Sequence, residues 1–123
     1  MSVEDIINFI GSKIKQDAPL ISRGYGVTWS EMTTERVSSI VANTLRAESS
    51  SIESFAKKEG IREDELGKAT EELLNEMFLQ ATRRGRKEVL PEDFNSALTS
   101  LQWNIWPFCK SGERSGSVTF RGL

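Results

Sequence analysis

The segment from residue 62 to residue 84 places the strongest constraint on the fold. Its apolar residues recur every three or four positions, which is the spacing of one face of a helix. Acidic residues at 63–65 begin the segment and Arg83 and Arg84 end it, the order that the helix dipole favours. Gly85 follows, and glycine commonly stands where a helix stops. We therefore predict a helix over 62–84 with an apolar stripe that another part of the protein must cover.

Two earlier segments also show helical spacing. Apolar residues predict a short helix over 3–16, with Ser2 as its N-cap. Residues 34–59 repeat the pattern after two threonines of the cap type, but the serines at 49–51 interrupt it, because serine side chains compete with helical hydrogen bonds. We expect either one long helix over 34–59 or two pieces that separate near these serines.

The other segments complete an all-α fold class. Residues 17–32 contain Pro19, Gly24 and Gly26, and we expect a loop or a pair of short extended pieces. We expect this segment to pack over the core, and the alternative is a binding loop. Pro91 is expected to open a last short helix that ends near Trp103. The expected organisation is an N-terminal helix with its packed loop (1–32), a helical domain (33–106) and a partly flexible tail (107–123).

The composition excludes several kinds of site. The chain of 123 residues has no histidine and one cysteine, Cys109. Catalysis by histidine, metal sites that need histidine, thiolate zinc clusters and internal disulfides are therefore excluded. We expect a non-enzymatic protein with no catalytic residues, no metal and no cofactor. Its apolar runs are too short to span a membrane and its N-terminus is acidic, so we expect a cytoplasmic protein.

Residues 85–93 carry the most informative motif, which reads GRKEVLPED. With the helices on either side, this motif resembles the end of the histone fold, in particular that of the small archaeal-type histones. The resemblance is confined to about residues 62–103. It implies a histone-like fold with a long central helix, to which this chain adds an N-terminal helix and a C-terminal tail. It also implies that 34–47 is the first histone helix and that the first loop falls within 48–61.

The resemblance further implies a structural ion pair between Arg86 and Asp93. The expected local geometry agrees with this pair, because an extended link after a helix brings Arg86 close to the first turn of the next helix. A guanidinium and a carboxylate can then form two parallel hydrogen bonds. Val89 lies on the same link, and we expect it to pair with another loop as a two-residue bridge.

Four cations gather at the end of the predicted helix over 62–84, and they are the candidate nucleic-acid contacts: Arg83, Arg84, Arg86 and Lys87. The net charge of −2 excludes attraction to DNA by bulk charge. Glu88 stands where archaeal-type histones carry a threonine that contacts phosphate. We therefore expect weak, sequence-independent binding of DNA. The alternative is that Arg86 is structural and that the other three cations only complement the helix dipole.

The apolar stripe of 62–84 also predicts a partner. A histone-type trio of helices leaves its central helix partly uncovered, so we expect a homodimer or a related histone-fold partner, unless the N-terminal helix substitutes for one. The predicted dimer interface comprises Leu66, Leu73, Leu74, Met77, Phe78 and Ala81.

The function predicted from the sequence is a non-enzymatic, dimerising interaction module with weak DNA binding. Such a module would be nucleoid-associated or nuclear if it binds DNA. The alternative is a protein-only adaptor or inhibitor that acts through its acidic helix faces and its aromatic C-terminal segment.

Overall fold

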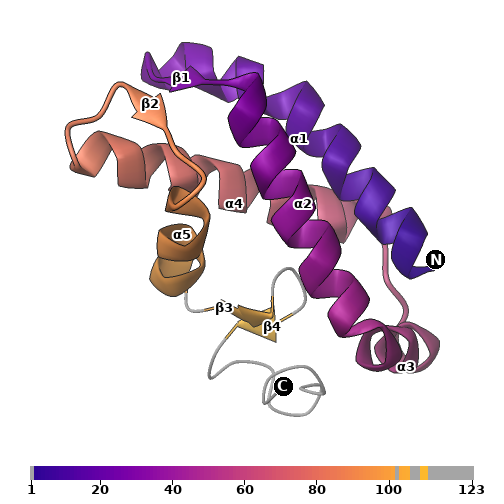
Figure 1. The fold of residues 1–123 in the computed structure, drawn as a ribbon. Helices are drawn as coiled ribbons and strands as arrows, with labels where there is room; N and C mark the ends of the chain where they lie inside the picture. The colour runs from indigo at the N-terminus through magenta and orange to yellow at the C-terminus, as the bar shows by residue number, and fades with distance from the viewer. Residues whose placement is uncertain (1, 102, 106–108, 111–123) are drawn as a thin grey trace.

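The computed structural model describes residues 2–101, 103–105 and 109–110, which form a predominantly helical fold (Figure 1). The all-α class predicted from the sequence is confirmed. In the described residues the helices are α1 (Val3–Tyr25), α2 (Glu31–Ala47), α3 (Ser49–Glu59), α4 (Glu63–Arg83) and α5 (Asp93–Leu101). The short strands β1 (Thr28–Trp29) and β2 (Glu88–Val89) pair in parallel, and β3 (Trp103–Ile105) pairs antiparallel with β4 (Cys109–Lys110).

Helix α1 is longer than the sequence predicts. Ser2 and Asp5 form a capping box at its start, as expected for an N-cap serine, and Gly26 ends it in the left-handed conformation. The expected end at residue 16 is wrong, because the helix continues through Pro19 to Tyr25. Of the segment 17–32 that is expected to be non-helical, only 26–30 lies between the two helices. Ala18 is fully buried and Ile21 packs against the core. This packing offsets the cost of about 3 kcal/mol that a proline imposes inside a helix.

The second expected helix is two helices. Ser30 caps α2 by accepting a hydrogen bond from the Thr33 N–H, so the helix begins three residues before the expected start. It ends at Ala47, and Glu48 leads directly into α3. The histone-like loop expected within 48–61 is therefore wrong for most of that range. The side chain of Ile52 is buried and holds α3 against the rest of the fold.

The core forms where α1 packs on both α2 and α4, and where α4 packs on α5 (Figure 1). Phe78 of α4 stacks on Tyr25 with ring centroids 5.4 Å apart, and the ring centroids of Phe78 and Trp29 are 5.5 Å apart. Lys13 of α1 reaches across to α4, where its Nζ lies 3.2 Å from Glu71 and 3.1 Å from Asp17 on its own helix. Hydrogen bonds to Asp17 and Glu71 raise the pKa of Lys13. Helix α1 thus covers α4 with both apolar and charged contacts.

The β1–β2 bridge joins the link after α1 to the link after α4. The Thr28 N–H donates to the Lys87 carbonyl at 2.8 Å, and the buried Thr33 hydroxyl donates to the Val89 carbonyl at 3.1 Å. Trp29 Nε1 donates to Thr34 Oγ1 at 2.7 Å, which holds the start of α2 against β1. The expected pairing of Val89 with another link is confirmed, and its partner is Trp29.

Most of the predicted tail (107–123) lies outside the described residues, as do Trp106 and Phe108 of the predicted aromatic segment. Among the described helices, none combines the length and the apolar character that crossing a bilayer requires.

Candidate functional site

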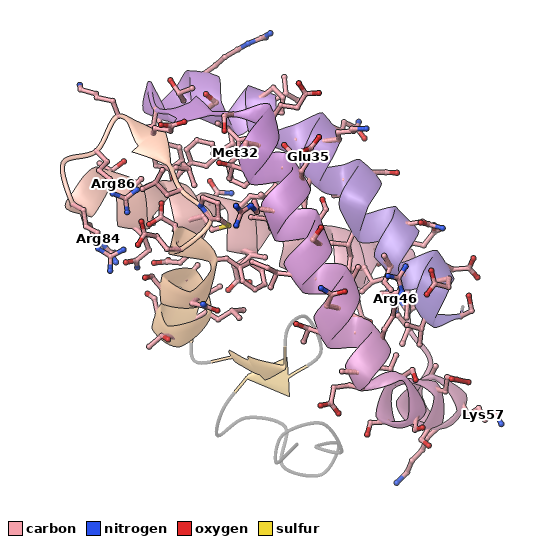
Figure 2. The ribbon with its side chains drawn as sticks, viewed as in Figure 1. Met32, Glu35, Arg46, Lys57, Arg84 and Arg86 are labelled. Carbon is pink, nitrogen blue, oxygen red and sulfur yellow. The ribbon has the colours of Figure 1, made fainter. Side chains whose placement is uncertain are left out.

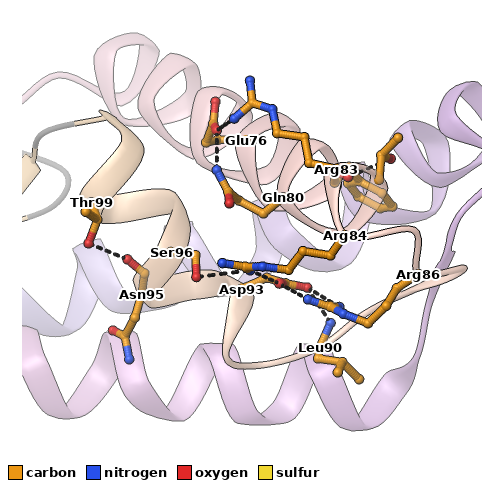
Figure 3. Close-up of polar contacts among 12 residues, drawn as sticks. Glu76, Gln80, Arg83, Arg84, Arg86, Leu90, Asp93, Asn95, Ser96 and Thr99 are labelled. Carbon is orange, nitrogen blue, oxygen red and sulfur yellow. Dashed lines mark hydrogen bonds and ion pairs between the residues drawn. The ribbon is translucent and has the colours of Figure 1, made fainter.

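The link between α4 and α5 is organised around the buried carboxylate of Asp93. Gly85 adopts a φ of 71°, which ends α4, and the Arg86 N–H then donates to the Ala81 carbonyl at 3.0 Å. The Arg86 guanidinium donates to both carboxylate oxygens of Asp93, with Nη1 to Oδ2 at 2.9 Å (Figure 3). The Leu90 N–H also donates to Oδ2, at 2.8 Å. The expected Arg86–Asp93 pair is therefore present, and it connects the link to the start of α5.

These contacts shift the pKa of both partners. Burial on its own raises the pKa of Asp93, but the hydrogen bonds from Arg86 and from the Leu90 N–H, with the charges of Arg86 and Arg84, bring it below its usual value. The hydrogen bond to Asp93 raises the pKa of Arg86. Asp93 is thus a carboxylate that its surroundings hold in the charged form.

A second arginine shares the same carboxylate, which the sequence analysis missed. Arg84 Nη1 lies 3.3 Å from Asp93 Oδ1 and donates to the Ser96 hydroxyl at 3.2 Å. The Arg84 side chain is 49% exposed, whereas that of Arg86 is 26% exposed. Two guanidinium groups therefore meet one carboxylate, and Arg84 is the more exposed of the two.

Glu76 forms a second polar centre about two turns before the end of α4. Its Oε2 accepts a hydrogen bond from Gln80 at 2.9 Å, and Arg83 Nη1 lies 3.5 Å away (Figure 3). The same atom accepts a hydrogen bond from the Ser100 hydroxyl of α5, also at 2.9 Å. The i+4 and i+7 spacing of Gln80 and Arg83 from Glu76 is visible in the sequence and could have indicated this contact. The Ser100 contact depends on the packing of α5 and has no local sequence signal.

The cluster of four predicted DNA contacts is therefore divided by the structure. Arg86 points to Asp93, Arg84 shares Asp93, and Arg83 pairs with Glu76. Lys87 is exposed beside the β1–β2 bridge and forms no ion pair within the part of the chain that the structure describes. Glu88 and Glu92 are also exposed in the same link. Carboxylates of the same chain thus offset most of the positive charge at this corner.

Arg46 and Lys57 lie away from this corner. Figure 2 shows Arg84 and Arg86 at one end of the molecule, and Arg46 and Lys57 toward the other end. Arg46 forms a two-point contact with Glu4 on α1, with Nε to Oε2 at 2.9 Å. The hydrogen bond to Arg46 lowers the pKa of Glu4.

The six residues predicted to form a dimer interface all lie in the core of a single chain: Leu66, Leu73, Leu74, Met77, Phe78 and Ala81. Helix α1 packs on α4 from one side and α5 from another. None of the six is open to a second copy in this fold, so their assignment to a dimer interface is corrected to the core. The physical reason is that α1 and α5 both pack on α4 and cover this stripe.

Among the described residues, no group of three or more cysteine, aspartate or glutamate side chains is arranged to hold a metal ion. The chain matches no family model, and neither a curated protein nor a solved structure is similar to it.

Proposed function

We propose that the chain is a non-enzymatic interaction module that recognises a protein partner through the face formed by α4 and α5. The observation that carries this proposal is the pairing of the basic residues at the end of α4 with carboxylates of the same chain. A DNA phosphate would have to displace these carboxylates or compete with them, which weakens the charge-driven part of DNA binding. A protein partner, in contrast, can use exposed polar groups that are already held in place by such pairs.

The second support is the polar character of this face. Asn95, Thr99 and Ser100 are exposed along α5, and Gln80 and Arg84 face them from α4 around a shared groove. Hydrogen bonds from Arg84 to Ser96 and from Ser100 to Glu76 hold the two helices together across the groove. The face is therefore both accessible and built on fixed helices, which favours recognition by hydrogen bonds.

Affinity capture with the full chain tests this proposal through two matched variants. Asn95→Arg changes the α5 face, and Asn43→Arg makes the same exchange at an exposed position of α2. We expect a protein from the source cells to be retained by the wild type and by Asn43→Arg, and to be lost with Asn95→Arg. Direct binding of the purified partner should reproduce this difference. Equal retention by both variants, or retention of no protein by the wild type, would contradict the proposal.

A second candidate function is weak, sequence-independent DNA binding. The resemblance of residues 62–103 to the histone fold also suggests this function. The observation that favours it is Lys87, which is exposed beside the β1–β2 bridge and forms no ion pair with the residues that the structure describes. The exposed Arg83 and Arg84 lie nearby in the chain. These three cations could contact a phosphate backbone without disturbing the Arg86–Asp93 pair.

A further inference from the structure

A groove of about 400 Å³ lies between α4 and α5, and all of its lining residues are polar: Gln80, Arg84, Asn95, Ser96, Thr99 and Ser100. Hydroxyl and amide groups surround a single charged side chain, Arg84. No apolar side chain lines this groove, and its polar groups can distinguish ligands by charge and hydrogen bonding. The guanidinium atoms of Arg84 that are not already hydrogen-bonded therefore determine what the groove can bind.

Arg84 uses only part of its hydrogen-bonding capacity. Its Nη1 contacts Asp93 and Ser96, while its Nε and Nη2 form no hydrogen bond with any residue that the structure describes. These two atoms form one edge of the guanidinium, and such an edge matches the two oxygens of a carboxylate. Contacts on the other side hold the guanidinium at the groove (Figure 3).

The local charge selects a group with a single negative charge. Arg84 and Arg86 share the buried carboxylate of Asp93, and the exposed Glu92 also acts on Arg86, so the charge of Arg84 is only partly offset. Glu76 lies beside the far part of the groove, where it accepts a hydrogen bond from Ser100. A carboxylate would balance the single charge of Arg84, whereas a dianionic phosphate would bring a second negative charge, which no further cation of the groove lining offsets, close to Glu76.

We propose that this groove binds a carboxylate, with the Nε–Nη2 edge of Arg84 as the charged contact. The natural ligand is an aspartate, a glutamate or a C-terminal carboxylate of a protein partner, and in this respect the inference rests on the proposed function. Asp93 and Ser96 position Arg84, and the exposed side chains of Asn95 and Thr99 add neutral hydrogen-bonding groups around the bound carboxylate.

A titration of the ¹⁵N-labelled full chain with sodium acetate, at an ionic strength held constant with chloride, tests the site by NMR. We expect saturable shifts confined to the amides of residues 80, 84 and 95–100. Arg84→Gln should weaken acetate binding by about tenfold or more, because a charge-assisted hydrogen bond is lost. The matched control is Arg83→Gln, which changes an adjacent and similarly exposed arginine of α4. It should reduce the acetate affinity much less than Arg84→Gln, because Arg83 acts on the groove only through the charge of Glu76.

Thr99→Glu provides a second variant that does not disturb the contacts of Asp93. It places a negative charge at an exposed position of the groove and should also weaken acetate binding. Shifts that rise linearly without saturating, or an equal loss of affinity in Arg83→Gln, would overturn the proposal. Tighter binding of inorganic phosphate than of acetate would overturn the assignment to a carboxylate. Acetate binding without capture of any partner would contradict the proposed function alone, and capture without acetate binding would contradict this inference alone.

Discussion

Arg86 and Asp93 form a two-point ion pair in which the side chain of Asp93 has no exposed surface. Replacement of one partner of such a pair leaves the other charge without compensation. We expect Arg86→Ala to lower the free energy of unfolding by about 1–4 kcal/mol, with Arg84 as the remaining cation beside Asp93. Urea denaturation followed by circular dichroism measures this change.

A double-mutant cycle separates the pair from its surroundings. Asp93→Ala should cost a similar amount, and the double variant should cost less than the sum of the single variants, because the two side chains interact directly. Arg84→Ala should cost less than Arg86→Ala, since Arg84 makes one contact with Asp93 and is more exposed. Additive effects below about 0.5 kcal/mol would show that Arg86 behaves as an ordinary surface residue.

The lowered pKa of Asp93 predicts a pH dependence of stability. The unfolded chain protonates this carboxyl near a pH of about 4, above the pKa of the folded state. The contribution of Asp93 is therefore fully present above that pH, and it is lost as the pH falls through the folded-state pKa. The free energy of unfolding should decline on acidification below about pH 4, and the decline should be smaller in Asp93→Asn. Parallel pH profiles of the two proteins would contradict the assignment.

Thr33 provides the buried side-chain contact between the start of α2 and β2. Thr33→Val keeps the shape of the side chain but removes the donor to the Val89 carbonyl, which leaves a buried acceptor without its partner. We expect a loss of about 1–3 kcal/mol in the free energy of unfolding. The control is Thr44→Val, which makes the same exchange at an exposed position of α2 and should change stability little. Similar losses in both variants would attribute the effect to valine in a helix rather than to the bridge.

The covered stripe of α4 predicts a monomer. The six apolar residues that the sequence predicts in a dimer interface are buried by α1 and α5 within one chain. A second chain is therefore not required to cover them. Light scattering should give the mass of one chain, 13.8 kDa, across the micromolar range of concentration. A dimer mass that persists on dilution would restore the case for association through a histone-type arrangement.

DNA binding should be weak and should fade as salt rises. Because Asp93 holds Arg86, three cations of the cluster remain for phosphate, namely Arg83, Arg84 and Lys87. The slope of the logarithm of the DNA-binding constant against the logarithm of the salt concentration should therefore be no steeper than about −3. Gel-shift titrations at low salt should show a complex that Arg83→Ala/Arg84→Ala/Lys87→Ala abolishes. Glu88→Thr should strengthen the complex by removal of a negative charge. The control replaces Arg46, Lys57 and Lys58, which removes the same charge from the other end of the molecule, and it should leave the complex intact.

The sequence predicts best those elements that are determined locally. The helix expected over 62–84 is α4, because its periodicity, its acidic start and its final glycine all agree. The predicted end of α1 is wrong because Pro19 suggests a helix end from local sequence alone. The burial of Ala18, which favours a longer helix, depends on contacts with other elements. The Arg86–Asp93 pair could be predicted because a recognisable spacing carries it. Arg84 could not be placed on Asp93, since this contact depends on how α5 packs against α4.

The β1–β2 bridge implies an order of assembly. The Thr33–Val89 hydrogen bond joins positions 56 apart, so its formation must close a long loop of chain that includes most of α2 and all of α3 and α4. Closing such a loop costs entropy that only the completed contacts repay, and contacts of this kind form slowly. Helices α1 and α2 are neighbours along the chain and can meet first, while the bridge must wait for α4 to dock. The contacts of Asp93 join positions no more than 9 apart, so they can form before the bridge does. In refolding, the β1–β2 bridge beside Lys87 would therefore be among the last parts of the protein to acquire its final shape.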